Sequence, residues 1–356
     1  MKVALIGVGQ AGGKVAQSIV EFDRGMGFDA VQDAFAVNTA APDLQALDID
    51  SMLVGQDRVK GHGVGGDNEL GAQIIQEEAA EVMDRLGERI TSEVEAVVLV
   101  AGLGGGTGSG GAPALAKELR QVYDLPVYVL GILPGRDEGA IYQANAGRSL
   151  KTVARESDAA LLIDNDAWRE SGESVEEGFE SINEQIARRV GLLLASGETV
   201  GGVAESVVDS SEVINTLRGG GIASLGYATA EAGEDAGANV NTIASLARSA
   251  LLTGMSLPDA VDAEAALLVI AGSPERISRK GVDRARKWLE NETGSLQVRG
   301  GDFPLDTDQL GALVLLGGVE RSQRVQEFMD RAREARDRSQ KQPVEAFRNE
   351  QLEDLF

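Results

Sequence analysis

The stretch Gly104-Gly105-Gly106-Thr107-Gly108-Ser109-Gly110 decides the fold of this chain. It follows an apolar segment, residues 97–101, and precedes a helical pattern that begins at Pro113. Glycine at this density costs backbone entropy, and it is justified where backbone amides must approach an anion with no side chain between them. The hydroxyls of Thr107 and Ser109 add donors. The stretch therefore predicts a phosphate-binding loop between a buried strand and a helix.

A second glycine-rich loop, Gly7-Val8-Gly9-Gln10-Ala11-Gly12, follows the strand-like residues 2–6 and opens a helix. Its spacing matches the dinucleotide-binding pattern, but the next strand ends in Val37-Asn38-Thr39, without the acid that binds a ribose diol. The Walker A pattern also fails, because Val15 follows Lys14 and Val8 replaces the leading glycine. A nicotinamide-dependent oxidoreductase is kept as an alternative, although it leaves the glycine loop at residues 104–110 unexplained.

The composition excludes several classes of protein. The 356 residues include no cysteine and one histidine, His62, which argues against thiolate chemistry, Cys-ligated zinc, a Ser-His-Asp triad and multi-histidine metal sites; we assign His62 no role. The 57 acidic and 33 basic residues give a net charge of −24, with the acidic residues dispersed along the chain as in proteins of salt-loving organisms. That charge repels phosphate backbones, so we expect no nucleic-acid partner.

We expect a cytoplasmic protein without direct membrane insertion. The first residues turn into glycine before a signal-peptide core develops, neither end carries a lipidation motif, and no apolar run approaches about 20 residues.

The pattern of apolar residues predicts an α/β architecture with an N-terminal Rossmann-like domain on a parallel sheet. Its predicted strands are residues 2–6, 34–38, 96–101, 127–133 and 159–163, and its helices are 13–22, 68–86 and 113–122, the last with Pro113 in the first turn. Apolar residues at three- and four-residue spacing predict one long helix over 175–196. A smaller α+β domain follows, with predicted strands at 223–228, 265–271, 295–299 and 311–316 and helices at 240–252 and 279–292.

These elements divide the chain into four parts. We expect an N-terminal domain with both glycine loops (residues 1–174), a central connecting helix (175–197), a part with a loop and the second domain (198–320), and a charged C-terminal helix and tail (321–356).

The glycine loops carry a resemblance to a known family. Residues 104–110 are similar to the signature loop of the tubulin and FtsZ superfamily, and Gly9-Gln10-Ala11-Gly12 resembles the first loop of tubulin. Residues 36–39, 63–68, 134–139 and 164–166 are similar, in order, to further nucleotide loops. The resemblance covers about residues 1–320 and, with the acidic bias, is greatest to the archaeal CetZ group. It implies a tubulin/FtsZ-like fold in which residues 1–174 form a GTP-binding domain that holds GTP or GDP with Mg²⁺, and residues 198–320 contain a catalytic loop.

The resemblance also implies roles for individual residues. Glu138 matches an acid that contacts the ribose, Asn165 and Asn183 match asparagines that contact the guanine edge, and Phe179 supports the base. Tyr142 stands where FtsZ has an arginine. No side chain is singled out as a metal ligand. The remaining nucleotide-binding residues are Gln10, Ala11, Gly12, Gly13, Lys14, Asn38, Gly65, Gly66, Gly104, Gly105, Gly106, Thr107, Gly108 and Ser109.

Residues 207–213 align with the loop that triggers hydrolysis in the neighbouring subunit of this superfamily. Asp209 and Glu212 are its two acids, and Val207 replaces the family's asparagine. The same two acids fit an N-cap and capping-box pair for a helix over 213–218. We expect Glu212, with Asp209 beside it, to polarise the attacking water, and Asp209 also to cap the helix.

The resemblance implies a cytoskeletal GTPase that polymerises head to tail, completes GTP hydrolysis in trans and serves in cell shape, with motility or division as other roles. A nucleotide-dependent scaffold or filament cap with little hydrolysis is the second alternative. The apolar residues Phe347, Leu352, Leu355 and Phe356 in the tail suggest a docking motif for a partner protein, with folding back onto the domain equally open.

Overall fold

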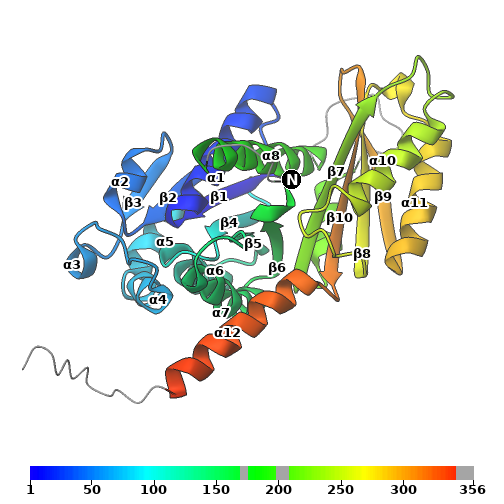
Figure 1. Cartoon of the computed structure of the whole chain (residues 1–356). Helices are drawn as coiled ribbons and strands as arrows, with labels where there is room; N and C mark the ends of the chain where they lie inside the picture. The colour runs from blue at the N-terminus through cyan, green and yellow to red at the C-terminus, as the bar shows by residue number, and fades with distance from the viewer. Residues whose placement is uncertain (169–174, 198–207, 342–356) are drawn as a thin grey trace, which may run out of the picture.

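The computed structural model describes residues 1–168, 175–197 and 208–341. Within them, ten strands form one continuous sheet in the order β3-β2-β1-β4-β5-β6-β7-β10-β8-β9 (Figure 1). The expected tail motif and Val207 lie outside the described residues.

The N-terminal half is a parallel sheet with helices on both faces. Its strands pair in parallel, and the predicted α/β class is confirmed. The strands are β1 (Val3–Val8), β2 (Val31–Asn38), β3 (Asp50–Leu53), β4 (Ala96–Gly102), β5 (Val127–Leu133) and β6 (Ala159–Asp164). The helices are α1 (Gly9–Met26), α2 (Ala41–Gln45), α3 (Gln56–Val59), α4 (Asn68–Glu77), α5 (Ala79–Gly87), α6 (Thr107–Val122) and α7 (Ala140–Glu156).

Strand β4 shows why this sheet is covered on both faces. Its side chains alternate between two apolar clusters: Val98 and Val100 pack with α1 and the central helix, whereas Val97 and Leu99 pack with α4, α6 and α7. A strand buried on both faces is a continuous apolar run, which is how these residues stand in the sequence.

The central helix α8 (Val175–Ser196) agrees with the predicted range. Its apolar stripe enters the core beside α1, as expected of Ile182, Ile186 and Val190. The guanidinium of Arg189 lies 4.0 Å from the ring centroid of Trp168 and 5.5 Å from that of Tyr227 on β7. Burial lowers the pKa of Arg189 to about 10, so the group is still charged at neutral pH.

The C-terminal half extends the same sheet rather than forming a separate one. Strand β6 pairs with β7 through Ala160 with Ile222 and Leu161 with Ala223. The elements are α9 (Ser210–Leu217), β7 (Ile222–Glu231), α10 (Val240–Leu252), β8 (Ala263–Gly272), α11 (Arg279–Thr293), β9 (Gln297–Pro304), β10 (Gln309–Val319) and α12 (Gln323–Lys341). Helices α10 and α11 pack on these strands around a third apolar cluster.

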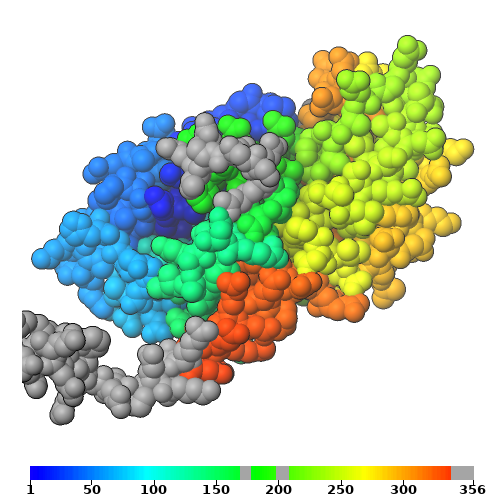
Figure 2. All heavy atoms as spheres, in the orientation of Figure 1, coloured from blue at the N-terminus to red at the C-terminus, as the bar shows by residue number. Residues whose placement is uncertain are grey.

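Helix α12 returns to the N-terminal half and packs against α7. Phe328 is fully buried there, and Gly147 of α7 has no room for a Cβ because the carbonyl of Phe328 lies against it. Figure 2 shows α12 along the lower edge of the molecule, beneath the atoms of both halves. The last described helix is therefore part of the surface of the N-terminal half.

Two predicted helices need correction. The helix expected over 68–86 is divided into α4 and α5 at Glu78. Helix α6 begins at Thr107, so the prediction of Pro113 in the first turn is wrong. The interior proline is tolerated because the carbonyl of Ser109, which its missing N–H leaves free, accepts a hydrogen bond of 2.8 Å from the Ser149 hydroxyl.

Candidate functional site

A cavity of about 780 Å³ lies at the carboxyl edge of the parallel strands. This edge is where open α/β sheets bind ligands. The loops after β1, β2, β4, β5 and β6 all reach it, together with the first turns of α8. Of the sequence-predicted residues, those that line it are Gln10, Ala11, Lys14, Asn38, Gly65, Gly66, Gly104, Gly105, Gly106, Thr107, Gly108, Glu138, Asn165, Phe179 and Asn183.

The two glycine loops pack directly against each other. Gly9 has φ +76°, and a Cβ there would lie 2.9 Å from the backbone nitrogen of Gly108. Behind them, the buried hydroxyls of Thr39 and Thr107 are 2.7 Å apart. The chain thus brings amides from two separate loops to one wall of the cavity, which suits an anionic group.

Asn145 of α7 connects two of these loops. Its Nδ2 donates to the carbonyl of Gly66 at 2.7 Å and to that of Gly104 at 3.1 Å, and the residue is 1% exposed. Its amide therefore holds the signature loop against the loop at residues 63–66.

Polar side chains at the other end of the cavity form a second group. The Oε1 of Glu138 accepts from the amide of Gly135 at 2.7 Å and lies 3.4 Å from Nδ2 of Asn165. Phe179 of α8 and Tyr142 of α7 are exposed and line the same cavity. The cavity thus has a glycine-lined end and an end with amide, carboxylate and aromatic groups.

Three predicted binding residues do not line the cavity. A Cβ on Gly12 would collide with the carbonyl of Val100, and one on Gly13 would lie 2.7 Å from Leu47, so both glycines allow α1 to pack closely. The hydroxyl of Ser109 donates to the carbonyl of Gly105, two residues before α6 begins.

Asp209 and Glu212 lie in the C-terminal half, and neither lines the cavity. Asp209 is the N-cap of α9, and its Oδ1 accepts from the amide of Glu212 at 3.1 Å. The Oε2 of Glu212 lies 3.0 Å from Nε of Arg299 on β9.

Two family models match consecutive parts of the chain. Residues 2–173 match the GTPase domain of the tubulin/FtsZ family, and residues 172–334 match the C-terminal domain of tubulin-like CetZ. The chain belongs to the CetZ group of the tubulin/FtsZ family. Its first domain is a GTPase domain, which sets aside the nicotinamide-dependent alternative.

Similar CetZ proteins come from Haloferax volcanii. The chain is 65% identical to the tubulin-like protein CetZ2 over the full length of both, and 49% identical to CetZ1 over 95% of this chain and 93% of that protein. A solved structure described as a GTPγS-bound protofilament of CetZ2 has a TM-score of 0.92 and 66% identity, and covers 96% of this chain and all of that one. A GDP-bound CetZ1 monomer has a TM-score of 0.88 and 50% identity, with 95% of this chain and all of that one covered.

The structure adds cavity residues to those predicted for this CetZ-group chain. Asp43, His62 and Asp137 line the cavity, and Asn38 donates to Asp43 at 3.0 Å. Asp137 falls within residues 134–139, which resemble a nucleotide loop, but no motif singled out Asp43 on α2 or gave His62 a role.

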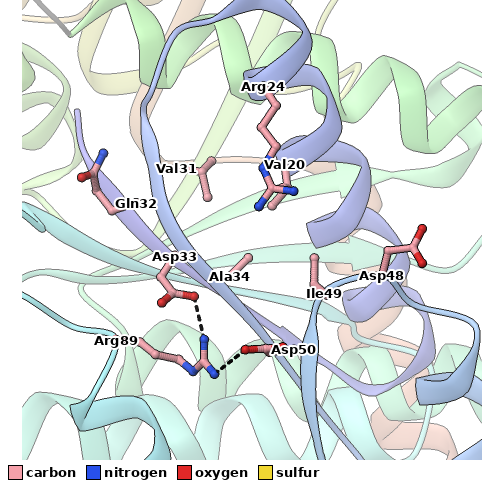
Figure 3. Close-up of a pocket in the computed structure, with 10 residues that line it drawn as sticks. All are labelled: Val20, Arg24, Val31, Gln32, Asp33, Ala34, Asp48, Ile49, Asp50 and Arg89. Atoms are coloured by element: carbon pink, nitrogen blue, oxygen red, sulfur yellow. Dashed lines mark hydrogen bonds and ion pairs between the residues drawn. The ribbon is translucent and has the colours of Figure 1, made fainter.

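A second cavity of about 370 Å³ lies at the start of β2 and β3, at the opposite end of these strands from the glycine loops. Arg89 donates to Asp33 and to Asp50 at 2.8 Å each (Figure 3). The guanidinium also lies 4.7 Å from the ring centroid of Phe35. The charges of Arg89, Asp33 and Asp50 are paired with one another, so we assign these three residues a structural role.

No helix in the described ranges combines the length and the hydropathy needed to cross a membrane.

Proposed function

We propose that this chain assembles head to tail into filaments and hydrolyses GTP where two subunits meet, in control of cell shape. The observation that carries the proposal is the separation of the nucleotide cavity from the acids of α9 within one subunit. The likeness to a GTPγS-bound CetZ2 protofilament supports it. A head-to-tail contact is heterologous, so it propagates into filaments rather than closing as a dimer.

The glycine-lined end of the cavity receives the phosphates in this proposal. Backbone amides of residues 104–108, with Gln10, Ala11 and Lys14, surround them, and Thr107 supplies a hydroxyl. Gly12, Gly13 and Ser109 shape these loops from behind. The nucleoside lies at the other end, with Glu138 at the ribose, Asn165 and Asn183 at the guanine edge and Phe179 against the base.

We further propose Mg²⁺ bound mainly through the phosphates. Among the described residues no group of three or more His, Cys, Asp or Glu side chains could hold a metal ion. Mg²⁺ in nucleotide sites keeps several waters and takes one or two protein oxygens besides phosphate oxygens, which is compatible with Gln10 and Asp43 at this cavity. When bound, the ion neutralises charge on the β- and γ-phosphates.

Catalysis in trans assigns Glu212 to the site of the next subunit. There its carboxylate polarises the attacking water, while Asp209 caps α9 and fixes the start of that helix. A monomer then has a complete binding site and an incomplete catalytic one.

The test is GTP turnover per molecule against protein concentration in molar KCl with Mg²⁺. We expect specific activity to rise above a threshold concentration, and Glu212→Ala to bind GTP without turning it over. Glu290→Ala, an exposed acid on α11, is the matched control.

Mixing variants distinguishes hydrolysis in trans from hydrolysis within one subunit. Glu212→Ala has an intact cavity, and Asn183→Ala has an intact Glu212 but a weakened cavity. We expect the equimolar mixture to regain turnover that neither variant has alone. Turnover independent of concentration would reject the trans mechanism, and assembly with GTP without hydrolysis would favour the scaffold alternative.

A further inference from the structure

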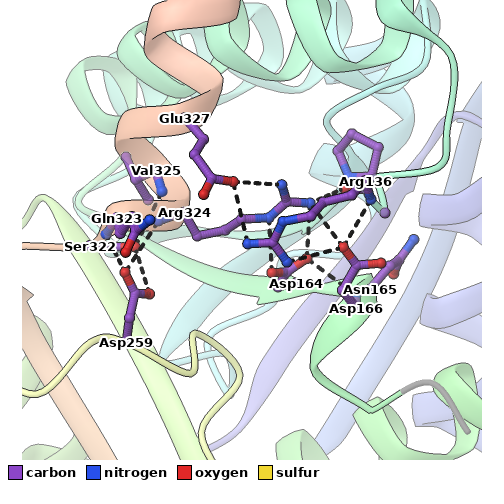
Figure 4. A network of polar contacts seen from close by, with 12 residues as sticks. Arg136, Asp164, Asn165, Asp166, Asp259, Ser322, Gln323, Arg324, Val325 and Glu327 are labelled. Atoms are coloured by element: carbon purple, nitrogen blue, oxygen red, sulfur yellow. Dashed lines mark hydrogen bonds and ion pairs between the residues drawn. The ribbon is translucent and has the colours of Figure 1, made fainter.

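Arg324, in the first turn of α12, extends into the loops that form the nucleoside end of the cavity (Figure 4). Its side chain is 2% exposed, as is that of its partner Asp164 at the end of β6. Arg324 Nε lies 2.9 Å from Asp164 Oδ2, and Nη2 donates to the carbonyl of Pro134 at 2.7 Å. One guanidinium therefore joins α12 to the loop after β5 and to the loop after β6.

Each residue at the ends of β5 and β6 that the side chain of Arg324 contacts either lines the cavity or is next in sequence to a residue that lines it. Pro134 itself lines the cavity, and Asp164 directly precedes Asn165, which also lines it. Asp166, on the other side of Asn165, lies 3.4 Å from Arg324 Nη2 and accepts from the backbone amide of Arg136 at 2.9 Å. Asn165 is thus held between two carboxylates that share the same arginine.

The loop after β5 is fixed through the same network. Glu138 Oε1 accepts from Gly135, the residue after Pro134, and lies 3.4 Å from Asn165 Nδ2. The guanidinium of Arg324 also stacks 4.3 Å from the ring centroid of Phe328, which anchors α12 in the core. The distance between Glu138 and Asn165 therefore depends on Arg324 of α12, which follows Asp164 by 160 positions in the sequence.

We propose that Arg324 is a positioning residue for nucleoside recognition, which sets Asn165 against Glu138 and thereby the preference for guanine. The proposal rests on the function proposed above, in which these two residues contact the nucleoside. Arg324 does not line the cavity, and the hydrogen bonds of its side chain go to Pro134, Asp164, Asp166 and Glu327 rather than to residues 104–108.

The substitution Arg324→Met needs a second variant beside it, because the ion pair between Arg324 and Asp164 is buried. Arg324→Met leaves Asp164 charged without its partner, and breaking a buried pair from one side is strongly destabilising. The double variant Arg324→Met with Asp164→Asn removes both charges and restores folding if the first variant does not fold. Arg324→Lys keeps the charge but loses the planar fork that reaches Asp164 and Pro134 together. Arg333→Met, an exposed arginine on the same helix, is the control.

The experiment measures equilibrium binding of GTP, ITP and pyrophosphate by the full chain below its assembly threshold, at a temperature where thermal unfolding shows every variant folded. ITP lacks the exocyclic amine of guanine. We expect Arg324→Lys and the double variant to bind GTP about tenfold more weakly. The GTP-to-ITP preference should shrink, pyrophosphate affinity should be unchanged, and Arg333→Met should behave as wild type.

An unchanged GTP-to-ITP preference in folded Arg324 variants overturns the inference, because the arginine then only attaches α12 to the N-terminal half. Asn165→Ala separates this failure from failure of the proposed function. If Asn165→Ala retains the full preference, the assignment of Asn165 is itself wrong; if it loses the preference while the Arg324 variants keep it, only the role of Arg324 is rejected.

Discussion

The Oε2 of Glu212 on α9 lies 3.0 Å from Nε of Arg299 on β9, with 38% of the glutamate side chain exposed. The side chain proposed to act on the next subunit is therefore held by an arginine of its own chain through a buried oxygen, Oε2, while the side chain as a whole stays partly exposed. Because both partners are partly exposed, the pair contributes little to stability, and we infer that its main effect is to fix the direction of the carboxylate.

Replacing Arg299 should lower catalysis without affecting nucleotide binding. Arg299→Gln removes the positive charge beside Glu212, and the cavity is formed by other residues. We expect GTP turnover in the assembled state to fall by about tenfold while GTP affinity of the monomer stays the same. Steady-state turnover above the assembly threshold and equilibrium binding below it check this. Unchanged turnover would show that the ion pair does not orient Glu212.

Variants of Asp209 should separate helix capping from catalysis. Its side chain caps α9, and loss of such a cap costs about 1 kcal/mol. Asp209→Ala should lower the free energy of unfolding by that amount, whereas Asp209→Asn should keep most of it. If Asp209 also acts on the water, Asp209→Asn reduces GTP turnover at full stability. Urea unfolding and turnover measured on the same preparations compare the two effects; an Asn variant with full activity assigns Asp209 to capping alone.

Asn145 should support both stability and nucleotide affinity. Asn145→Leu leaves the carbonyls of Gly66 and Gly104 without their buried donor. We expect the free energy of unfolding to fall by about 2 kcal/mol, with weaker GTP binding, since the two loops are no longer held together. Asn291→Leu, on the exposed surface of α11, is the control, and equal effects in the two variants would contradict the prediction.

Two alanine substitutions in the signature loop should have different consequences. A Cβ on Gly110 would collide with the carbonyl of Asn68 on α4, whereas one on Gly105 would be 3.9 Å from its nearest neighbour. Gly110→Ala should destabilise the fold by about 3 kcal/mol, from overpacking. Gly105→Ala should leave the melting temperature unchanged and weaken GTP binding, because Gly105 lines the cavity. A stable Gly110→Ala would mean that α4 and α6 separate at little cost.

Acidification should partly rescue Arg324→Met. Burial raises the pKa of the Asp164 carboxyl, and Arg324 opposes that effect, so the substitution raises this pKa further. A carboxyl whose pKa is higher in the folded than in the unfolded state stabilises the fold below its unfolded pKa and loses that contribution as pH rises through the folded pKa. The stability deficit against wild type should therefore shrink from about pH 8 to about pH 5. Urea unfolding measures it, and in the double variant with Asp164→Asn the deficit should not change with pH.

The sequence predicted best those elements whose residues repeat regularly. Helix α8 and helix α10 were placed at both ends, because their apolar side chains follow the helical period over several turns. The elements β3, α2, α3 and α7 were not predicted, since the first three are only four or five residues long and α7 is buried mainly against α6 and α12.

The site shows the same division. Glycine density and motif order predicted the loops that line the cavity, because backbone geometry leaves a local trace in the sequence. The contacts of Asn145 and Arg324 leave no such trace, since their partners lie far away along the chain. The interior position of Pro113 was missed for a related reason: the hydroxyl that compensates it comes from Ser149 on another helix.

The joint between β6 and β7 has a mechanical consequence. In the described structure two residue pairs connect these strands, whereas β7 and β10 are paired from Gln309 with Glu231 to Gly317 with Ala223. A short ladder resists torsion less than a long one, so this joint also depends on side-chain contacts across it: the Ser256 hydroxyl donates to the carbonyl of Leu162 at 2.7 Å, and the Ser210 hydroxyl of α9 donates to Glu95 at 2.6 Å. In a head-to-tail polymer a small turn in every subunit adds up along the length. In the proposed filament, stiffness and curvature would then depend on the few strand pairs and side-chain contacts at this joint inside each subunit.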